Sequence, residues 1–149
     1  MLSNASKYAI RAVLFLANKS SNTQKYGSKH LADSLEIPNP FLAKLLQQLS
    51  RAGVISSAKG PGGGFYLTDQ NRQRHISDIL NVIEKENVLH TCLMGLPRCG
   101  DANPCPIHHL AAPFMVELRK KFNVQTIDEL ANEVKENGTY LTLKGLDDL

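Results

Sequence analysis

All three cysteines of this 149-residue chain, Cys92, Cys99 and Cys105, lie in one short stretch, and no cysteine occurs elsewhere. An odd number of cysteines argues against a disulfide framework and in favour of metal or redox chemistry. Thiolates are soft ligands that hold iron–sulfur clusters and zinc. The stretch therefore predicts a metal or cluster site.

Metal and cluster sites of this kind usually have four ligands, so three cysteines leave one position open. His108 and His109 follow Cys105 by three and four residues. If a helix begins at Pro106, Cys105 is its N-cap, and both imidazoles lie on the same side of the helix as Cys105. Either histidine is therefore a candidate for the fourth ligand.

Zinc and simple burial are the alternatives to a cluster. Cys₃His is a standard set of structural zinc ligands, although zinc sites usually contain Cys-x₂₋₄-Cys knuckles, which this stretch lacks. Cys92 stands beside Leu93 and Met94 and would also suit a buried apolar position. Three cysteines and a following histidine in one stretch favour a metal or cluster over burial.

The cysteines belong to a segment, residues 86–106, that shows neither helical nor strand periodicity. A loop this long in a compact domain requires a function or a constraint. After it, apolar residues at four-residue intervals predict a helix over residues 106–122 that Pro113 kinks. These apolar residues are Leu110, Phe114, Leu118 and Phe122. Thr126 and Glu129 form a capping box for a last short helix.

Charge divides the chain into two halves. Residues 1–74 contain ten Lys or Arg residues and three acidic residues, a net charge of +7, whereas the remainder has a net charge of −4. A basic half joined to an acidic half is expected when one end of a protein binds nucleic acid. Ordinary solvated surface charge explains the same numbers equally well, so the sequence motifs must decide between nucleic-acid binding and a simple charged surface.

The basic half contains the pattern of a helix-turn-helix. After a first helix over residues 6–18, Ser28 is a preferred N-cap for a short helix that ends before Pro38. Asn39 then caps a second helix with Pro40 at its first position. The second helix has an apolar inner face and an outer face of amides and cations: Leu42, Leu45, Leu46 and Leu49 inside, and Lys44, Gln47, Gln48 and Arg51 outside. Such a pair of helices matches a helix-turn-helix.

A β-hairpin is predicted directly after the second helix. Residues 54–57 form the first strand, residues 59–64 a glycine-rich turn, and residues 65–67 the returning strand. The turn is not a phosphate-binding loop, because neither Gly-Lys-Ser/Thr nor a helix follows it. A hairpin in this place is a wing, and Lys59 at its base is positioned to enter a DNA groove.

Enzymatic function is not indicated. The chain contains no Cys-x-x-Cys motif, no nucleophile–base constellation and no nucleotide-binding fingerprint. The longest apolar run near the start, residues 12–17, is too short to span a bilayer. We therefore expect a cytoplasmic, non-enzymatic protein without a membrane partner.

With the wing Lys59-Gly60-Pro61-Gly62-Gly63-Gly64 and the three-cysteine stretch both placed, the chain resembles the Rrf2 family of bacterial transcription regulators. The similarity extends from Tyr8-Ala9-Ile10-Arg11-Ala12 through Leu45-Leu46-Gln47-Gln48-Leu49 to Thr126-Ile127-Asp128-Glu129-Leu130. The resemblance implies a homodimer, joined by the long C-terminal helix, whose winged domains bind a roughly palindromic operator. It also implies that the cysteines hold an iron–sulfur cluster, and the Cys-x-x-His spacing of biogenesis-type members favours His108.

The chain departs from the family pattern at three points. Lys59 stands where relatives commonly have Arg, which predicts weaker insertion into the minor groove. The cysteine spacing, six residues and then five, differs from the five and five common in the iron–sulfur biogenesis subgroup. Residues 2–11 contain neither Asp nor Glu, so the acidic N-terminal ligand of some members has no counterpart. The cluster type is left open, with [2Fe–2S] favoured over [4Fe–4S].

We therefore predict a mostly α-helical fold with a small β-hairpin wing, in which a winged helix-turn-helix is followed by a long C-terminal dimerisation helix. The DNA-binding region occupies residues 1–84, the cluster-binding loop residues 85–105, and the dimerisation helix with a short last helix residues 106–149. The predicted metal ligands are Cys92, Cys99, Cys105 and His108. The predicted DNA contacts are Ser28, Asn39, Pro40, Phe41, Lys44, Gln48, Arg51, Lys59, Gly60, Pro61, Gly62 and Gly63.

The predicted function is a homodimeric regulator of transcription that binds a double-stranded DNA operator. Its affinity would be modulated by an iron–sulfur cluster that senses iron, redox state or nitric oxide. The apolar stripe of residues 110–122 exceeds what a short last helix covers, so a second copy of the chain should pack there. The alternative is a winged-helix regulator with structural zinc or no metal that signals through a protein or small-molecule partner. An additional protein partner is compatible with either.

Overall fold

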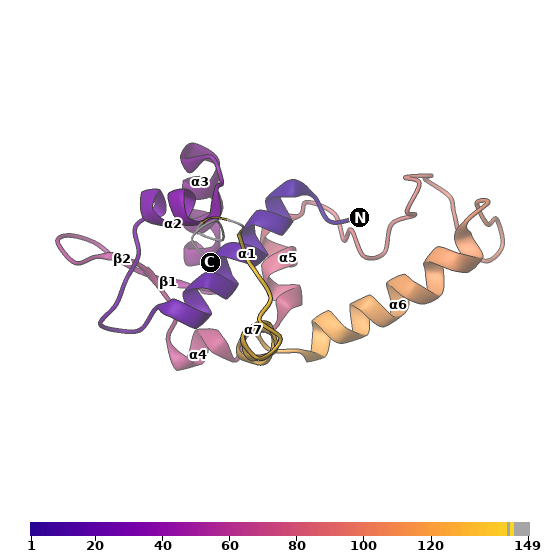
Figure 1. The fold of residues 1–149 in the computed structure, drawn as a ribbon. Coiled ribbons are helices and arrows are strands. Elements are labelled where there is room, and N and C mark those ends of the chain that lie inside the picture. The colour runs from indigo at the N-terminus through magenta and orange to yellow at the C-terminus, as the bar shows by residue number, and fades with distance from the viewer. Residues whose placement is uncertain (143, 145–149) are drawn as a thin grey trace.

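The computed structural model describes residues 1–142 and residue 144, and it shows a mostly helical protein with an antiparallel β-hairpin, as predicted. In chain order the elements are α1 (Asn4–Lys19), α2 (Ser28–Leu35), α3 (Asn39–Arg51), β1 (Ser56–Ala58), β2 (Gly64–Tyr66), α4 (Asp69–Arg72), α5 (Ile76–Ile83), α6 (His108–Val124) and α7 (Ile127–Glu136). Figure 1 shows a compact group of elements from which α6 and the segment before it project. We call α1 to α5, the hairpin and α7 the head, and residues 84–107 together with α6 the arm.

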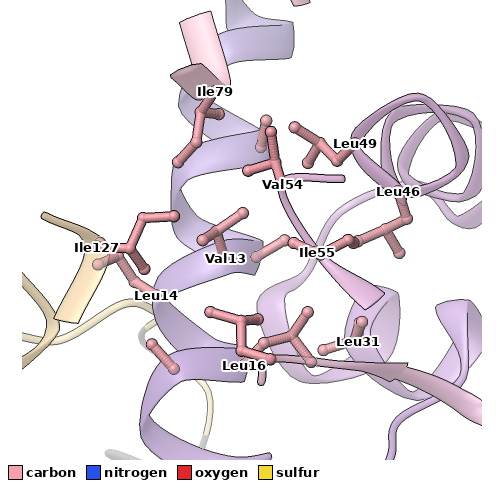
Figure 2. Packing of buried hydrophobic residues seen from close by; sticks show 14 of the residues in the cluster. Val13, Leu14, Leu16, Leu31, Leu46, Leu49, Val54, Ile55, Ile79 and Ile127 are labelled. Atoms are coloured by element: carbon pink, nitrogen blue, oxygen red, sulfur yellow. The ribbon is translucent and has the colours of Figure 1, made fainter. Parts of the chain in front are cut away.

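The head is built around α1, which packs against α2, α3, α5 and α7. Val13 and Leu16 on the inner face of α1 are fully buried. Figure 2 shows the side chains that surround them, which come from distant parts of the sequence: Leu31, Leu46, Leu49, Val54, Ile55, Ile79 and Ile127. Each such side chain contributes about 1.5–3 kcal/mol when it is fully buried. Apolar contacts between distant segments therefore hold the head together.

Helix α1 begins two residues before the predicted start. Ser3 is its N-cap, and the Ser3 hydroxyl accepts a hydrogen bond from the Ser6 amide at 3.1 Å. Glu84, directly after α5, accepts from the hydroxyls of Ser3 at 2.6 Å and Ser6 at 2.5 Å. Burial raises the pKa of Glu84, but these hydrogen bonds outweigh it and hold the pKa below its usual range. The start of α1 is thus tied to the point at which the arm leaves the head.

The predicted N-cap of α2 is wrong. Gly27 precedes the helix in an extended conformation, and Ser28 is the first helical residue. The backbone of Tyr26 pairs with that of Phe65 in β2, which keeps the chain extended as far as Gly27. A contact with a distant strand therefore decides where this helix begins.

The predicted N-cap of α3 is also one residue too late. Pro38 precedes the helix, Asn39 is its first residue and Pro40 its second. Helix α2 ends at Leu35 because Glu36 adopts the left-handed conformation, with φ of 56°. The amphipathic pattern of α3 is confirmed: Leu42, Leu45, Leu46 and Leu49 are buried, and Lys44, Gln47, Gln48 and Arg51 are exposed.

The wing is confirmed, with a shorter first strand than predicted. β1 starts at Ser56 because Val54 and Ile55, which precede it, are buried in the core of the head. β1 and β2 pair in antiparallel fashion with Ser57 opposite Phe65. Phe65 also exchanges two backbone hydrogen bonds with Tyr26, at 2.7 and 3.0 Å, so the segment before α2 supports the base of the wing.

Helix α6 begins at His108, two residues later than predicted, and is continuous through Pro113. Its N-cap is Ile107, so the prediction that Cys105 caps this helix is wrong. The reason is a turn after Cys105, closed by a hydrogen bond of 3.0 Å from the His108 amide to the Cys105 carbonyl. Residues 85–107 contain neither helix nor strand, as predicted.

Helix α7 returns the chain to the head, where it packs against α1. Its predicted capping box between Thr126 and Glu129 is confirmed. Beyond α7, the Leu141 carbonyl accepts a hydrogen bond of 2.8 Å from Arg11, so the end of the described chain lies against α1. Within the described residues no helix is both long enough and apolar enough to span a bilayer.

Candidate metal centre and nucleic-acid interface

The three cysteines converge at the end of the arm. Their Sγ atoms all lie within 4.8 Å of one another, and those of Cys92 and Cys105 are 3.8 Å apart. Cys105 is buried, and Cys92 and Cys99 are half-buried. Residues that are up to thirteen positions apart in a loop without regular structure are thus brought to one point.

The spacing of the thiols fits metal coordination. A tetrahedral metal with metal–sulfur bonds of about 2.3 Å holds two thiolates about 3.8 Å apart. The 3.8 Å between the sulfurs of Cys92 and Cys105 matches this separation. The donor set is therefore able to hold zinc or an iron of a cluster.

Backbone amides stabilise the thiolate form of Cys92. The amide of Leu96, followed by that of Met94, donates to its sulfur, and the pKa of this thiol falls to about 7 despite partial burial. The Cys105 amide donates to Cys99 Sγ at 3.4 Å, which by itself lowers the pKa of Cys99. Burial and the neighbouring sulfurs of Cys105 and Cys92 outweigh that effect, so the pKa of Cys99 is raised. Without a bound cation, the three cysteines therefore accommodate one ionised thiol more readily than two or three.

The structure places His108, and not His109, beside the thiols. Nδ1 of His108 lies 3.2 Å from Cys99 Sγ. His109 is exposed, with its ring 5.8 Å from the His108 ring between centroids. Cys105 and His108 are brought near each other by the turn that precedes α6, and not by a shared helix face.

A pocket of about 330 Å³ adjoins the thiols. All three cysteines and His108 line it, and α6 supplies the opposite wall with Ala111, Met115 and Arg119. The Arg119 guanidinium donates to the Leu89 carbonyl at 2.6 Å and so ties the loop to α6. The site therefore has room for more than a single ion and is built directly on α6.

The predicted DNA contacts lie at the end of the head away from α6, where Figure 1 shows α3 and the hairpin. Most of them are exposed: Asn39, Pro40, Phe41, Lys44, Gln48, Arg51, Lys59, Gly60, Pro61 and Gly62. Ser28 and Gly63 are half-buried. Phe41 also packs edge-on against Tyr8 of α1, with ring centroids 5.8 Å apart, and so helps to hold α3 against α1.

The wing glycines have different roles. Gly60 and Gly62 have φ of 83° and 73° and open space where a Cβ would stand, so they provide only backbone freedom. A Cβ on Gly63 would lie 2.4 Å from the Ala58 carbonyl oxygen, and one on Gly64 2.6 Å from the Tyr26 carbonyl carbon. The close approach of backbone therefore requires glycine at 63 and 64.

Two residues near these sites were not predicted from sequence. Asp101 contacts His108 Nε2 through Oδ1 at 3.0 Å. Lys25 lies over the ring of Tyr66 in the wing, 5.0 Å from its centroid. Asp101 lies in a loop outside any helix, and Lys25 is far from Tyr66 in the sequence, so no periodic sequence signal marked these residues.

Comparison with known proteins finds regulators of transcription. A family model named Rrf2, described as an iron-dependent transcriptional regulator, matches residues 2–133. The chain is 32% identical over 134 residues to an HTH-type transcriptional regulator of Aquifex aeolicus, across 89% of this chain and 92% of that protein. It is 29% identical over 134 residues to the HTH-type transcriptional regulator IscR of Cronobacter sakazakii, across 88% of this chain and 80% of that protein.

A solved structure shares the fold. CymR, the global cysteine regulator of B. subtilis, superposes with a TM-score of 0.68 at 20% identity, across 89% of this chain and 97% of CymR. The superposition confirms the predicted winged-helix fold. The matched family and relatives are regulators of transcription, which agrees with the prediction that the chain is not an enzyme.

Proposed function

Since the chain belongs to the Rrf2 family of transcriptional regulators, we propose that it is a homodimer whose affinity for an operator changes with the state of an iron–sulfur cluster. The observation that carries the sensing part is the gathering of three thiols within 4.8 Å at the end of the arm. When bound, such a cluster supplies a centre that exchanges electrons and reacts with oxidants and nitric oxide. The protein's own residues hold it and transmit its presence.

The proposed ligands are Cys92, Cys99, Cys105 and His108. They form two close pairs, Cys92 with Cys105 at 3.8 Å and Cys99 with His108 at 3.2 Å. A [2Fe–2S] cluster takes two protein ligands on each iron, whereas a [4Fe–4S] cluster takes one on each. The paired arrangement therefore supports [2Fe–2S] over [4Fe–4S].

The ligand loop is directly continuous with α6, which suggests how the cluster state reaches the DNA. Cys105 and His108 flank the turn from which α6 starts. Ligation would order residues 85–105, and its loss would release the N-terminal end of α6. An order–disorder element coupled to a rigid helix is a sufficient switch, with a typical coupling of about 1–3 kcal/mol.

A second copy of the chain is the proposed cover for α6. Leu110 is 81% exposed and Phe114 is 60% exposed, although both are large apolar side chains. Leu118 and Phe122, which belong to the same predicted stripe, are instead partly buried. Both pack against the small cluster of Leu80, Leu89 and Met115, and Phe122 also packs against the core of the head. A two-fold dimer through α6 would place two recognition helices about 34 Å apart, one turn of DNA.

In the proposed docking mode α3 reads base edges and the wing holds the backbone. Lys44, Gln48 and Arg51 all project from the exposed face of α3. Cations there neutralise phosphates, and amides pair with base edges in the major groove. Lys59, at the base of the wing, is the candidate for minor-groove insertion. Residues 1–84 then form the DNA-binding region, residues 85–105 the cluster loop, and residues 106–149 the dimerisation helix with the short last helix. Of this last segment, residues 143 and 145–149 lie outside the described part of the chain.

Anaerobic purification of the full chain tests the proposal. We expect visible absorption with about two iron and two sulfide per chain, and operator binding that changes when the cluster is removed. Binding of random duplex should weaken steeply with salt. A protein that holds only zinc after iron and sulfide are supplied contradicts the sensing part and leaves DNA binding intact.

A structural zinc ion is the second candidate for the site. The three sulfurs lie within 4.8 Å, a compact set that suits a single tetrahedral ion. In that case the regulator would respond to a protein or small-molecule partner. Zinc would still order the loop, but oxidation and reduction by one-electron reagents would leave the operator affinity unchanged.

A further inference from the structure

Asp101 and His108 form a carboxylate–imidazole pair beside the three thiols. Oδ1 of Asp101 lies 3.0 Å from Nε2 of His108, and Nδ1 of the same ring lies 3.2 Å from Cys99 Sγ. The His108 side chain is only 14% exposed, whereas that of Asp101 is fully exposed. The two nitrogens of one ring therefore face different partners.

These partners decide which nitrogen carries the hydrogen. An ionised carboxylate accepts hydrogen bonds and donates none, so Nε2 must carry the hydrogen that bonds Asp101. In a neutral imidazole the other nitrogen then has a free lone pair. That nitrogen is Nδ1, the atom directed at Cys99.

A tight turn presents Asp101 to the ring. Gly100 and Asn103 exchange two backbone hydrogen bonds, at 3.0 and 3.3 Å, with Asp101 and the next residue between them. The Asn103 side chain also donates to the Arg98 carbonyl at 3.1 Å. The carboxylate is thus held by a closed backbone turn between two of the cysteines.

We infer that Asp101 is a positioning residue that selects Nδ1 of His108 as the ligand atom for the metal held by the three cysteines. The inference rests on the proposed metal site. Histidine ligands generally donate their second ring N–H to a carboxylate, a carbonyl or water, and loss of that partner typically lowers metal affinity 10–100-fold. Asp101 stands at the required ring edge, opposite the thiols.

The test uses the full chain loaded with Zn²⁺, because zinc permits NMR and does not require a cluster to assemble. Long-range ¹H–¹⁵N spectra of the histidine rings identify which nitrogen binds the metal. Competition with a chromophoric chelator measures the affinity. The variants are Asp101→Ala and Asp101→Asn, with Glu86→Gln as a control that removes one charge from an exposed position of the same loop.

In the native protein and in Glu86→Gln, we expect zinc on Nδ1 and a hydrogen on Nε2. Asp101→Ala should lower zinc affinity about 10–100-fold and give a mixture of Nδ1-bound and Nε2-bound rings. Asp101→Asn should keep Nδ1 ligation with a smaller loss, because its amide oxygen still accepts from Nε2. Far-UV circular dichroism of each variant establishes that the fold is retained.

Ligation through Nε2 in the native protein, or a His108 ring that binds no zinc, would overturn the inference. It would also fail if Asp101→Ala behaved like Glu86→Gln. These outcomes are distinct from failure of the proposed function. A protein that assembles no iron–sulfur cluster, but binds zinc through Nδ1 in an Asp101-dependent way, contradicts the sensor and retains the positioning role.

Discussion

The head and the arm are stabilised in different ways. Among the described residues, twenty buried apolar side chains form the core of the head, whereas a second, small core of Leu80, Leu89 and Met115 lies where α5 of the head meets the arm. Polar contacts such as that between Arg119 and Leu89 supplement the small core. Much less apolar surface is therefore buried around the arm than inside the head.

The exposed surface shows the same contrast. Exposed large apolar residues of the arm include Met94, Leu96, Leu110 and Phe114, and the site of three thiols lies among them. A bound metal would satisfy the thiols and a second copy would cover the apolar face, so each would add stability that the single chain lacks. The arm is accordingly the region in which a signal can change the structure without unfolding the head.

The largest expected effect comes from the apolar face of α6. Phe114→Glu places a charge where the second copy should pack, so we expect monomers in sedimentation. Loss of the second half-site contact should lower operator affinity by about 10²–10⁴-fold. Lys120→Gln, which makes the same change in charge on exposed α6, is the control. A native protein that is already monomeric at micromolar concentration contradicts the dimer.

Shortening a buried side chain should lower the free energy of unfolding by different amounts in the head and beside the arm. Leu16→Ala removes a fully buried side chain of the head, and urea unfolding should show a loss of about 2–5 kcal/mol. Leu89→Ala removes a buried side chain from the smaller cluster between the arm and α5, so the loss should be smaller. Equal losses in the two variants would contradict this difference.

Removal of a thiol should affect the signal and not the fold of the head. Replacement of Cys92, Cys99 or Cys105 by Ala should abolish the visible chromophore. The operator affinity should then match that of the cluster-free native protein, a change of about 1–3 kcal/mol from the loaded form. Calorimetric unfolding of the cluster-free variants should match that of the cluster-free native protein. A retained chromophore in any variant removes that cysteine from the ligand set.

Substitutions at the DNA face should have smaller effects that are confined to the head. Arg51→Ala should weaken binding across all sequences and reduce the salt slope by about one unit, because one phosphate contact is lost. Lys59→Ala should instead reduce the preference for A·T-rich flanks if the wing enters the minor groove. Lys135→Ala, on the exposed side of α7, is the control. Unchanged affinity and preference in both variants would contradict the docking mode.

The smallest effect concerns thiol ionisation in the metal-free arm. The pKa of Cys92 is about 7 and that of Cys99 is raised, so Cys92 is half ionised near neutral pH while Cys99 remains protonated. Because the thiolate is the nucleophile, iodoacetamide should modify Cys92 first, with a rate that rises as pH increases through about 7. Mass spectrometry after timed quenching measures both rates. Faster modification of Cys99 at pH 7 would contradict the assignment.

Local patterns predicted the elements better than their boundaries. The leucine spacing of α3 and the Thr126 capping box depend on neighbouring residues only, and both are confirmed. The start of α2 at Ser28 depends on pairing between Tyr26 and Phe65, and the start of β1 depends on burial of Ile55. These boundaries were mispredicted because distant contacts decide them.

The candidate site shows the same division. Cysteine spacing and the following histidines were sufficient to predict a metal-binding loop, since ligand chemistry is a property of residue type. Three features became visible only in the tertiary structure. They are the turn between Cys105 and His108, the position of His108 instead of His109 beside the thiols, and the contact of His108 with Asp101. In a loop without regular structure, the spacing of residues along the sequence does not predict the direction in which their side chains point.

The sequence by itself determined the helix-turn-helix and the wing, and it predicted the types of candidate ligand and a cover on α6, because residue chemistry and short-range periodicity encode these features. Tertiary structure alone decided which apolar residues of α6 remain exposed: Leu118 and Phe122 pack against buried clusters, while Leu110 and Phe114 do not. It also decided that Gly63 and Gly64 are required by close backbone approach. Such features depend on which distant segments meet, and short-range sequence patterns do not specify that.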